Sequence, residues 1–155
     1  MDDIRFKVWD KVAKKMSEPF SLFGEFTLLG AVHLWQKEIL PESELSSIER
    51  LNDLIILQST GKEDKNKNQS YQGDLIVVKS YPFYGDAPEV EENGKYQQLN
   101  YVGEVFYWKE EACWYVGLHV VSDRVLGGAC GGALYNYNDF EIIGNIYENP
   151  ELLGN

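Results

Sequence analysis

Two cysteines and two histidines are the side chains of this 155-residue chain that best suit nucleophilic catalysis. A catalytic thiol needs a nearby base to form the thiolate, so Cys113 or Cys130 would have to meet a histidine. Of the histidines, His33 and His119, the second falls among aromatic and β-branched residues in a strand-like stretch. Neither cysteine lies in a motif of a known thiol enzyme. We therefore expect no catalytic residue, and keep a Cys-dependent hydrolase or transferase as the alternative.

Glycines and paired carboxylates are the next candidates for chemistry. The segment 127–132 is glycine-rich, but it lacks the Lys and Ser/Thr of a phosphate-binding loop, and strand-like residues follow it. It predicts a tight turn between strands. Two pairs of adjacent glutamates, Glu91-Glu92 and Glu110-Glu111, fall in polar turns. An acid/base pair needs one carboxyl in an apolar environment, which a solvated turn does not supply.

Metal and cofactor sites have no support in the spacing. The two histidines stand 86 positions apart, and no Cys-x-x-Cys pair occurs. Asp64, Asn66 and Asn68 resemble the start of a calcium loop. However, Gln69 and Leu75 occupy the positions where such a loop needs Gly and Glu. We expect no metal ion and no cofactor.

The charge is strongly acidic and unevenly distributed. Lys and Arg number 14 against 25 Asp and Glu, a net charge of −11. Residues 1–16 carry +2, whereas residues 85–155 carry −9. Nucleic-acid affinity depends on Lys and Arg displacing counterions, so direct binding to DNA or RNA is disfavoured. The acidic patch Glu89, Glu91 and Glu92 suits a basic partner, which makes an acidic nucleic-acid mimic that binds a basic host protein the alternative function.

Length and patterning predict a single domain, 1–155, that is mainly β within the α+β class. Residues 1–60 predict an N-terminal α+β portion, with a strand over Ile4–Val8 and a helix from Pro41 to about Leu54. Residues 61–155 predict a small β-barrel with an exposed insertion near 82–100. Its expected strands are 75–78, 101–108, 113–121, 133–137 and 140–147, with a bulge at Gly144 and Asn145.

No membrane segment or export signal is expected. The longest uncharged stretch, Val125–Asn138, has 14 residues, too few to cross a bilayer as a helix. The acidic start, Met1-Asp2-Asp3, has no apolar stretch behind it, so we expect no signal peptide and a cytoplasmic location. No membrane partner is predicted.

Aromatic residues concentrate in the predicted strands between Tyr101 and Tyr147. Tyr and Trp bury a large area at low entropic cost, and they are enriched at protein interfaces. We interpret Tyr107, Trp108 and Trp114 as candidate protein-interaction residues, beside the three glutamates. A non-enzymatic, self-associating module, a homo-oligomer that also contacts a host protein, is the first functional hypothesis. The competing interpretation is a group of tyrosines that only expose their hydroxyls.

Three segments together resemble the YopX-like family of bacteriophage and prophage proteins. They are Ile4–Lys11 with Lys14–Met16, the central run from Leu57 to Asp74, and Phe140–Leu153. The sequence departs from the family pattern at four central positions, which are Ser59, Lys62, Lys67 and Gln72. Lys67 stands where the family has the glycine of its central turn.

The resemblance implies an SH3-like barrel in a protein of phage origin. It places the protein in the cytoplasm of an infected or lysogenised bacterium. The family has no known activity, so it brings no catalytic residues to carry over.

Overall fold

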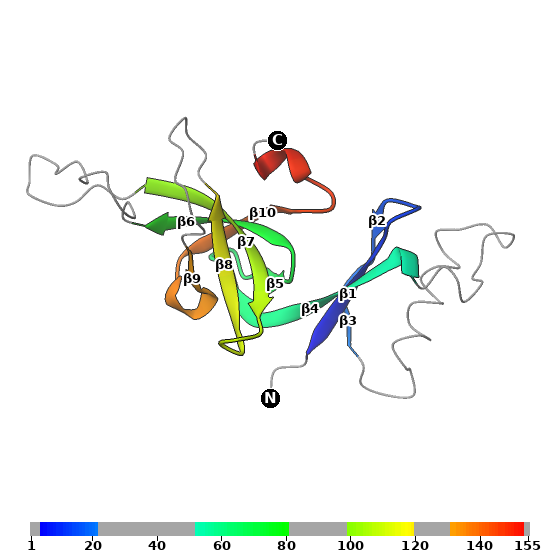
Figure 1. Ribbon diagram of the computed structural model, residues 1–155, viewed down its shortest axis with the longest axis horizontal. Coiled ribbons are helices and arrows are strands. Elements are labelled where there is room, and N and C mark those ends of the chain that lie inside the picture. The colour runs from blue at the N-terminus through cyan, green and yellow to red at the C-terminus, as the bar shows by residue number, and fades with distance from the viewer. Residues whose placement is uncertain (1–3, 22–51, 81–98, 120–130, 154–155) are drawn as a thin grey trace, which may run out of the picture. The chain divides into compact units, whose positions relative to one another are not determined.

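The computed structural model describes residues 4–21, 52–80, 99–119 and 131–153. Within these ranges the chain is mainly β, as the sequence predicts, and its strands form two five-stranded sheets. The chain divides into two compact units, Met1–Gly61 and Lys62–Asn155. Figure 1 shows the strands of each unit, and the two units are treated separately below.

Strand β1 (Arg5–Asp10) is the central strand of the first unit. Strands β2 (Lys15–Met16) and β3 (Phe20–Ser21) pair with it antiparallel. Its other neighbour is β4 (Leu54–Glu63), which is also antiparallel. The alternation of Ile4, Phe6 and Val8 predicts this strand correctly, and Val8 is fully buried.

A buried carboxylate fixes the turn that follows β1. Asp10 is 0% exposed, and its Oδ1 accepts hydrogen bonds from the backbone N–H groups of Val12 and Ala13, both at 2.9 Å. Beside the turn, the hydroxyl of Ser17 accepts the backbone N–H of Val8 at 2.9 Å. Such side-chain acceptors satisfy backbone donors that the sheet leaves unpaired.

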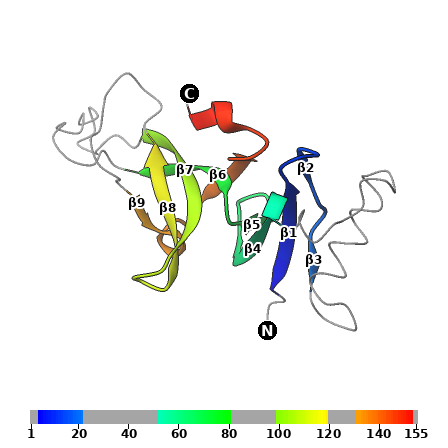
Figure 2. The same ribbon diagram turned by 45° about the vertical axis from the view of Figure 1, so that its right-hand side comes forward.

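The second unit holds one curled antiparallel sheet with the strand order β10-β6-β7-β8-β9. Figure 2 shows β6, β7, β8 and β9 following one another in this order. Its elements are β5 (Gln69–Tyr71), β6 (Asp74–Ser80), β7 (Leu99–Trp108), β8 (Cys113–His119), β9 (Gly131–Ala133), the 3₁₀ helix η3 (Leu134–Asn136), β10 (Phe140–Asn145) and the 3₁₀ helix η4 (Pro150–Leu153). The buried residues of its core cluster are Ile76, Val78, Tyr101, Val105, Val116, Leu134 and Phe140.

Gly73, between β5 and β6, needs to be glycine for two reasons. Its φ of +82° lies in the left-handed region, and a Cβ there would stand 2.9 Å from Cε2 of Tyr147. Its backbone bonds to two other segments. The N–H donates to the carbonyl of Val105 at 2.7 Å, and the carbonyl accepts the N–H of Ile146 at 2.9 Å. The turn therefore links β7 to the segment after β10.

Asp64 organises the loop between β4 and β5. Its side chain is 4% exposed, and its Oδ1 accepts the backbone N–H groups of Asn66 and Asn68 at 2.8 and 2.9 Å. Its Oδ2 accepts the backbone N–H of Ile142 in β10 at 3.2 Å. Next to it, the N–H of Lys65 donates to the carbonyl of Phe140. The loop thus covers the hydrogen-bonding edge of β10, which would otherwise be open.

Several predicted elements differ from the structure. Strand β4, Leu54–Glu63, begins where the predicted helix was expected to end, and it pairs with β1 and β5. Only the first residue of the predicted strand 133–137 belongs to a strand, because Leu134 turns into the core as part of η3. Strand β10 does contain a bulge, but the extra residue is Ile143, one position before the expected Gly144 and Asn145, which pair with Leu75 and Asp74.

Other predicted features lie outside the described residues. These include the insertion near 82–100 apart from its last two residues and nearly all of the helix expected up to Leu54, where β4 begins instead. Of the glycine-rich segment 127–132, the structure describes Gly131 and Gly132, which belong to β9.

Replacing Asp64 by Asn tests the loop anchor. Burial raises the pKa of Asp64, but hydrogen bonds from Asn68, Ile142 and Asn66 lower it by more. The resulting pKa lies below the ordinary value of 3.8. A depressed pKa stabilises the fold above the unfolded-state pKa, and this stability is lost as the pH falls through the folded-state pKa. We expect Asp64→Asn to cost about 1.5–3 kcal/mol at pH 7, the usual value of charged hydrogen bonds.

Denaturant titrations of both proteins between pH 7 and pH 2, followed by circular dichroism, measure this cost. The difference in unfolding free energy between them should shrink below about pH 4, where the unfolded-state carboxyl takes up its proton. A difference that stays constant over the whole pH range would contradict the role of the ionised carboxylate.

Lys67→Gly should stabilise the same loop. Lys67 has a φ of +68°, and a left-handed backbone costs a residue with a Cβ roughly 1–2 kcal/mol. After the extra chain entropy of glycine is subtracted, we expect a gain of about 0.5–1 kcal/mol, which is a few degrees in Tm. Asn66→Gly is the matched control, since Asn66 lies in the same loop without a positive φ. Thermal unfolding checks both, and an equal or larger gain in the control would refute the strain at Lys67.

Candidate functional site

The β7–β8 hairpin carries the aromatic residues predicted to contact a partner, and the residues near its turn are exposed. Its strands pair from Val102 with His119 to Trp108 with Cys113, and the turn 109–112 joins them. Ala112 closes this turn with a φ of +48°, and its N–H faces the carbonyl of Lys109 at 3.3 Å. We call residues 107–114 the aromatic hairpin tip.

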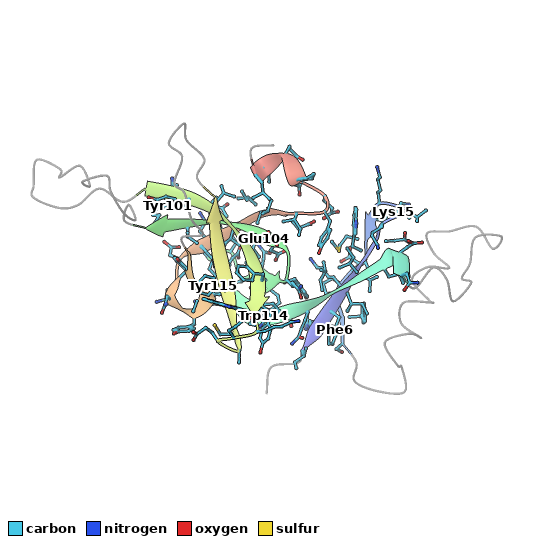
Figure 3. The ribbon with its side chains drawn as sticks, in the orientation of Figure 1. Phe6, Lys15, Tyr101, Glu104, Trp114 and Tyr115 are labelled. Carbon is cyan, nitrogen blue, oxygen red and sulfur yellow. The ribbon has the colours of Figure 1, made fainter. Side chains whose placement is uncertain are left out.

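One face of the tip carries Tyr107 and Trp114. They stand opposite each other in the register, and their rings meet edge to face with centroids 5.3 Å apart. Trp114, labelled in Figure 3, also packs against the core cluster. Tyr107 remains 45% exposed, although an aromatic ring usually buries most of its area. The core thus supports Trp114, and Trp114 supports a tyrosine ring that faces solvent.

The opposite face carries a second aromatic group. Successive residues of a strand point to opposite faces, so Trp108 and Tyr115 lie across the hairpin from Tyr107 and Trp114. The centroids of Trp108 and Tyr115 are 4.7 Å apart at 86°, an edge-on contact. Phe106 joins them, with its centroid 5.6 Å from that of Tyr115. All three rings are half-buried.

The predicted interaction residues therefore fall into three sets. Tyr107 and Trp114 touch each other, whereas Trp108 belongs to the other face. Glu89, Glu91 and Glu92 lie outside the described residues. Closeness in the sequence groups the three aromatic residues as one candidate surface. The alternation of side chains along a strand is the signal that assigns them to two faces.

Most of the side chains of the alternative Cys–His pair lie outside the described residues. Cys113 is half-buried at the start of β8, opposite Trp108. His119 ends β8, and its side chain lies outside the described part of the structure, as do Cys130 and His33. Among the side chains that the structure does describe, no group of three His, Cys, Asp or Glu could hold a metal ion. None of the described helices is long and apolar enough to cross a membrane.

Three titratable side chains have shifted pKa values for structural reasons. Burial raises the pKa of Tyr137, and the neighbouring Tyr115 adds to the shift. Burial also raises the pKa of Tyr147, with a smaller contribution from Glu104. Burial lowers the pKa of Lys62, whose Nζ donates to two carbonyl oxygens of η3 at 3.0 and 3.2 Å. The lysine thus links the end of β4 to η3.

The polar residues of the three resemblance segments bind backbone groups rather than converging on one site. Asp10 and Asp64 hold the turns described above. Asp74 Oδ2 accepts the N–H of Tyr71 at 2.8 Å. Asn145 Oδ1 accepts the N–H groups of Tyr147 and Glu148 at 3.0 and 2.9 Å. Each of these side chains acts as a turn anchor.

Sequence reasoning missed these anchors, although a signal was present. Each aspartate binds at least one backbone donor within four residues of itself, which is the spacing of a side-chain turn, whereas the bond from Ile142 to Asp64 spans 78 positions and has no local signal. The spacing around Asp64 resembles an incomplete calcium loop, and this resemblance hides its role as a turn anchor. No local pattern at Lys62 predicts its hydrogen bonds to η3.

The chain is similar to a known protein family and to a solved structure. A match to the YopX protein family covers residues 5–154. A comparison with curated proteins finds no match. Among solved structures, the crystal structure of protein EF1440 from Enterococcus faecalis is similar, with 24% identity over 97% of each chain and a TM-score of 0.48. On the family match, which spans nearly the whole sequence, this chain belongs to the YopX family.

Proposed function

We propose that this chain is a non-enzymatic protein-interaction module that associates with further copies of itself through the aromatic hairpin tip. The observation that carries the proposal is Tyr107, which is 45% exposed while its ring packs edge to face on Trp114. A ring held in place by a core residue loses little conformational freedom when it binds. It therefore suits the centre of an interface.

The turn anchors support the same proposal from another direction. Asp10, Asp64, Asp74 and Asn145 already accept backbone N–H groups. A carboxylate or amide engaged in this way holds the chain in its conformation, and moving it would cost the turn it supports. The surfaces left for a partner are therefore the exposed hairpin turns and strand faces.

The finer features of the proposal follow from the sequence and the family. We infer that the second unit is a small SH3-like barrel and that the first belongs to an N-terminal α+β portion. The protein is a phage or prophage accessory protein in the bacterial cytoplasm, and it takes no cofactor or metal. It works by protein contacts, with itself and with a host protein, and not by binding nucleic acid or membrane.

A second candidate function is an acidic nucleic-acid mimic that binds a basic host protein. Two exposed glutamates in the tip, Glu110 and Glu111, favour it, together with the net charge of −9 over residues 85–155. The two functions separate by mutation. Neutralising Glu89, Glu91 and Glu92 to Gln removes binding by the mimic and leaves self-association intact.

Light scattering of the full chain tests the self-association. At about 1 M salt, where exposed charges are screened within ~3 Å, we expect a defined multimer because aromatic burial does not depend on charge. Tyr107→Ser should weaken the association at least tenfold, since a central aromatic residue is worth more than about 1.4 kcal/mol.

Tyr135→Ser is the matched control for this measurement. Tyr135 is 69% exposed, but it lies in η3 and not in the hairpin tip. Its substitution should leave the mass unchanged. A wild-type monomer at low and high salt, or an equal loss in the control, would overturn the proposal.

A further inference from the structure

The turn between β1 and β2 displays three lysines together. Lys11, Lys14 and Lys15 are all exposed, and Val12 beside them is 60% exposed. We call residues 11–15 the basic hairpin. In the described segment 4–21, five Lys and Arg stand against two Asp and Glu, a net charge of +3 within a chain of −11. This segment therefore has the opposite sign to the protein as a whole.

The basic hairpin has a fixed backbone. The buried carboxylate of Asp10 accepts the N–H groups of Val12 and Ala13, and the N–H of Lys11 donates to the carbonyl of Asp53 at 2.9 Å. Lys14 completes the turn with a φ of +50°. In Figure 3 the side chain of Lys15 extends away from the strands. The lysines are thus presented on a preformed turn, so that binding need not order the backbone.

The described part of the second unit has the complementary charge. Its ranges 62–80, 99–119 and 131–153 hold five lysines against ten Asp and Glu, a net charge of −5. The turn of its hairpin tip carries two adjacent exposed acids, Glu110 and Glu111, beside the exposed Lys109. The positive φ of Ala112 fixes the backbone of that turn as well.

We propose that the basic hairpin docks on the acidic turn at Glu110 and Glu111 of a second copy of this chain. The inference rests on the proposed self-association and adds a second contact to it. A net charge of −11 makes copies repel in most orientations, so close approach is favourable where unlike charges meet. At about 0.1 M salt this attraction acts over ~10 Å. Because the two surfaces differ, the contact is head-to-tail and is not limited to two copies.

Neutralised variants with two different tags test the contact at about 0.1 M salt. All carry Tyr107→Ser, which removes the aromatic contact without changing any charge. The first variant adds Lys11→Gln, Lys14→Gln and Lys15→Gln, and the second adds Glu110→Gln and Glu111→Gln. Each should bind its own kind at least tenfold more weakly than the Tyr107→Ser parent binds itself. Mixing the two restores binding, because the second variant keeps the lysines and the first keeps the glutamates.

Charge-matched controls neutralise exposed residues outside the two turns, with Lys65→Gln, Lys67→Gln and Lys79→Gln matching the first variant and Asp139→Asn and Glu151→Gln matching the second. They should bind like the parent. The inference is wrong if each variant binds itself with the affinity of the parent, or if the mixture binds as weakly as each variant alone. It is also wrong if the controls lose as much affinity as the variants. This result is independent of the aromatic contact, which is measured at about 1 M salt with Tyr107 present.

Discussion

The second unit depends on one buried carboxylate. Asp64 accepts four hydrogen bonds, two from backbone N–H groups of its own loop, one from the Asn68 side chain and one from Ile142 in β10. A buried charge is tolerated only when it is fully hydrogen-bonded, and here that requirement holds the loop against the last strand. The ion pair between Lys65 and Glu141 lies beside the same contact. The polar loop is thereby hydrogen-bonded to the edge strand β10.

The same use of polar residues recurs through the family segments. Asp10 fixes the first hairpin turn, and Asn145 fixes the turn after β10. Gly73 admits the close approach of Tyr147, and at Gly144 a Cβ would lie 2.5 Å from Oδ1 of Asn149. Each of these residues holds a turn or a close contact of the fold. Exposed side chains in the turns do not hold the backbone in this way. We therefore propose that partners bind at the exposed turns.

Much of this organisation follows from local pattern, and the rest depends on contacts distant in sequence. The alternation around Val8 and the aromatic run of β7 and β8 predict strands because their side-chain period is local. The glycine at 144 likewise predicts an irregularity in β10, which the structure places one residue earlier, at Ile143. By contrast, Leu134 leaves the predicted strand because the core takes its side chain, and Asp64 reaches Ile142 across 78 positions. The same alternation places Tyr107 and Trp108, which are adjacent in the predicted strand 101–108, on opposite faces of the sheet.

Amide hydrogen exchange on the full chain, at protein concentrations below and above the onset of association and at about 1 M salt, tests the central claim most directly. The claim is that the family segments hold the fold while the hairpin tip meets the partner copy. We predict that association protects amides of residues 107–114 and leaves those of the loop at Asp64 and of residues 140–153 unchanged. Protection that appears in those segments and not in the tip would contradict it.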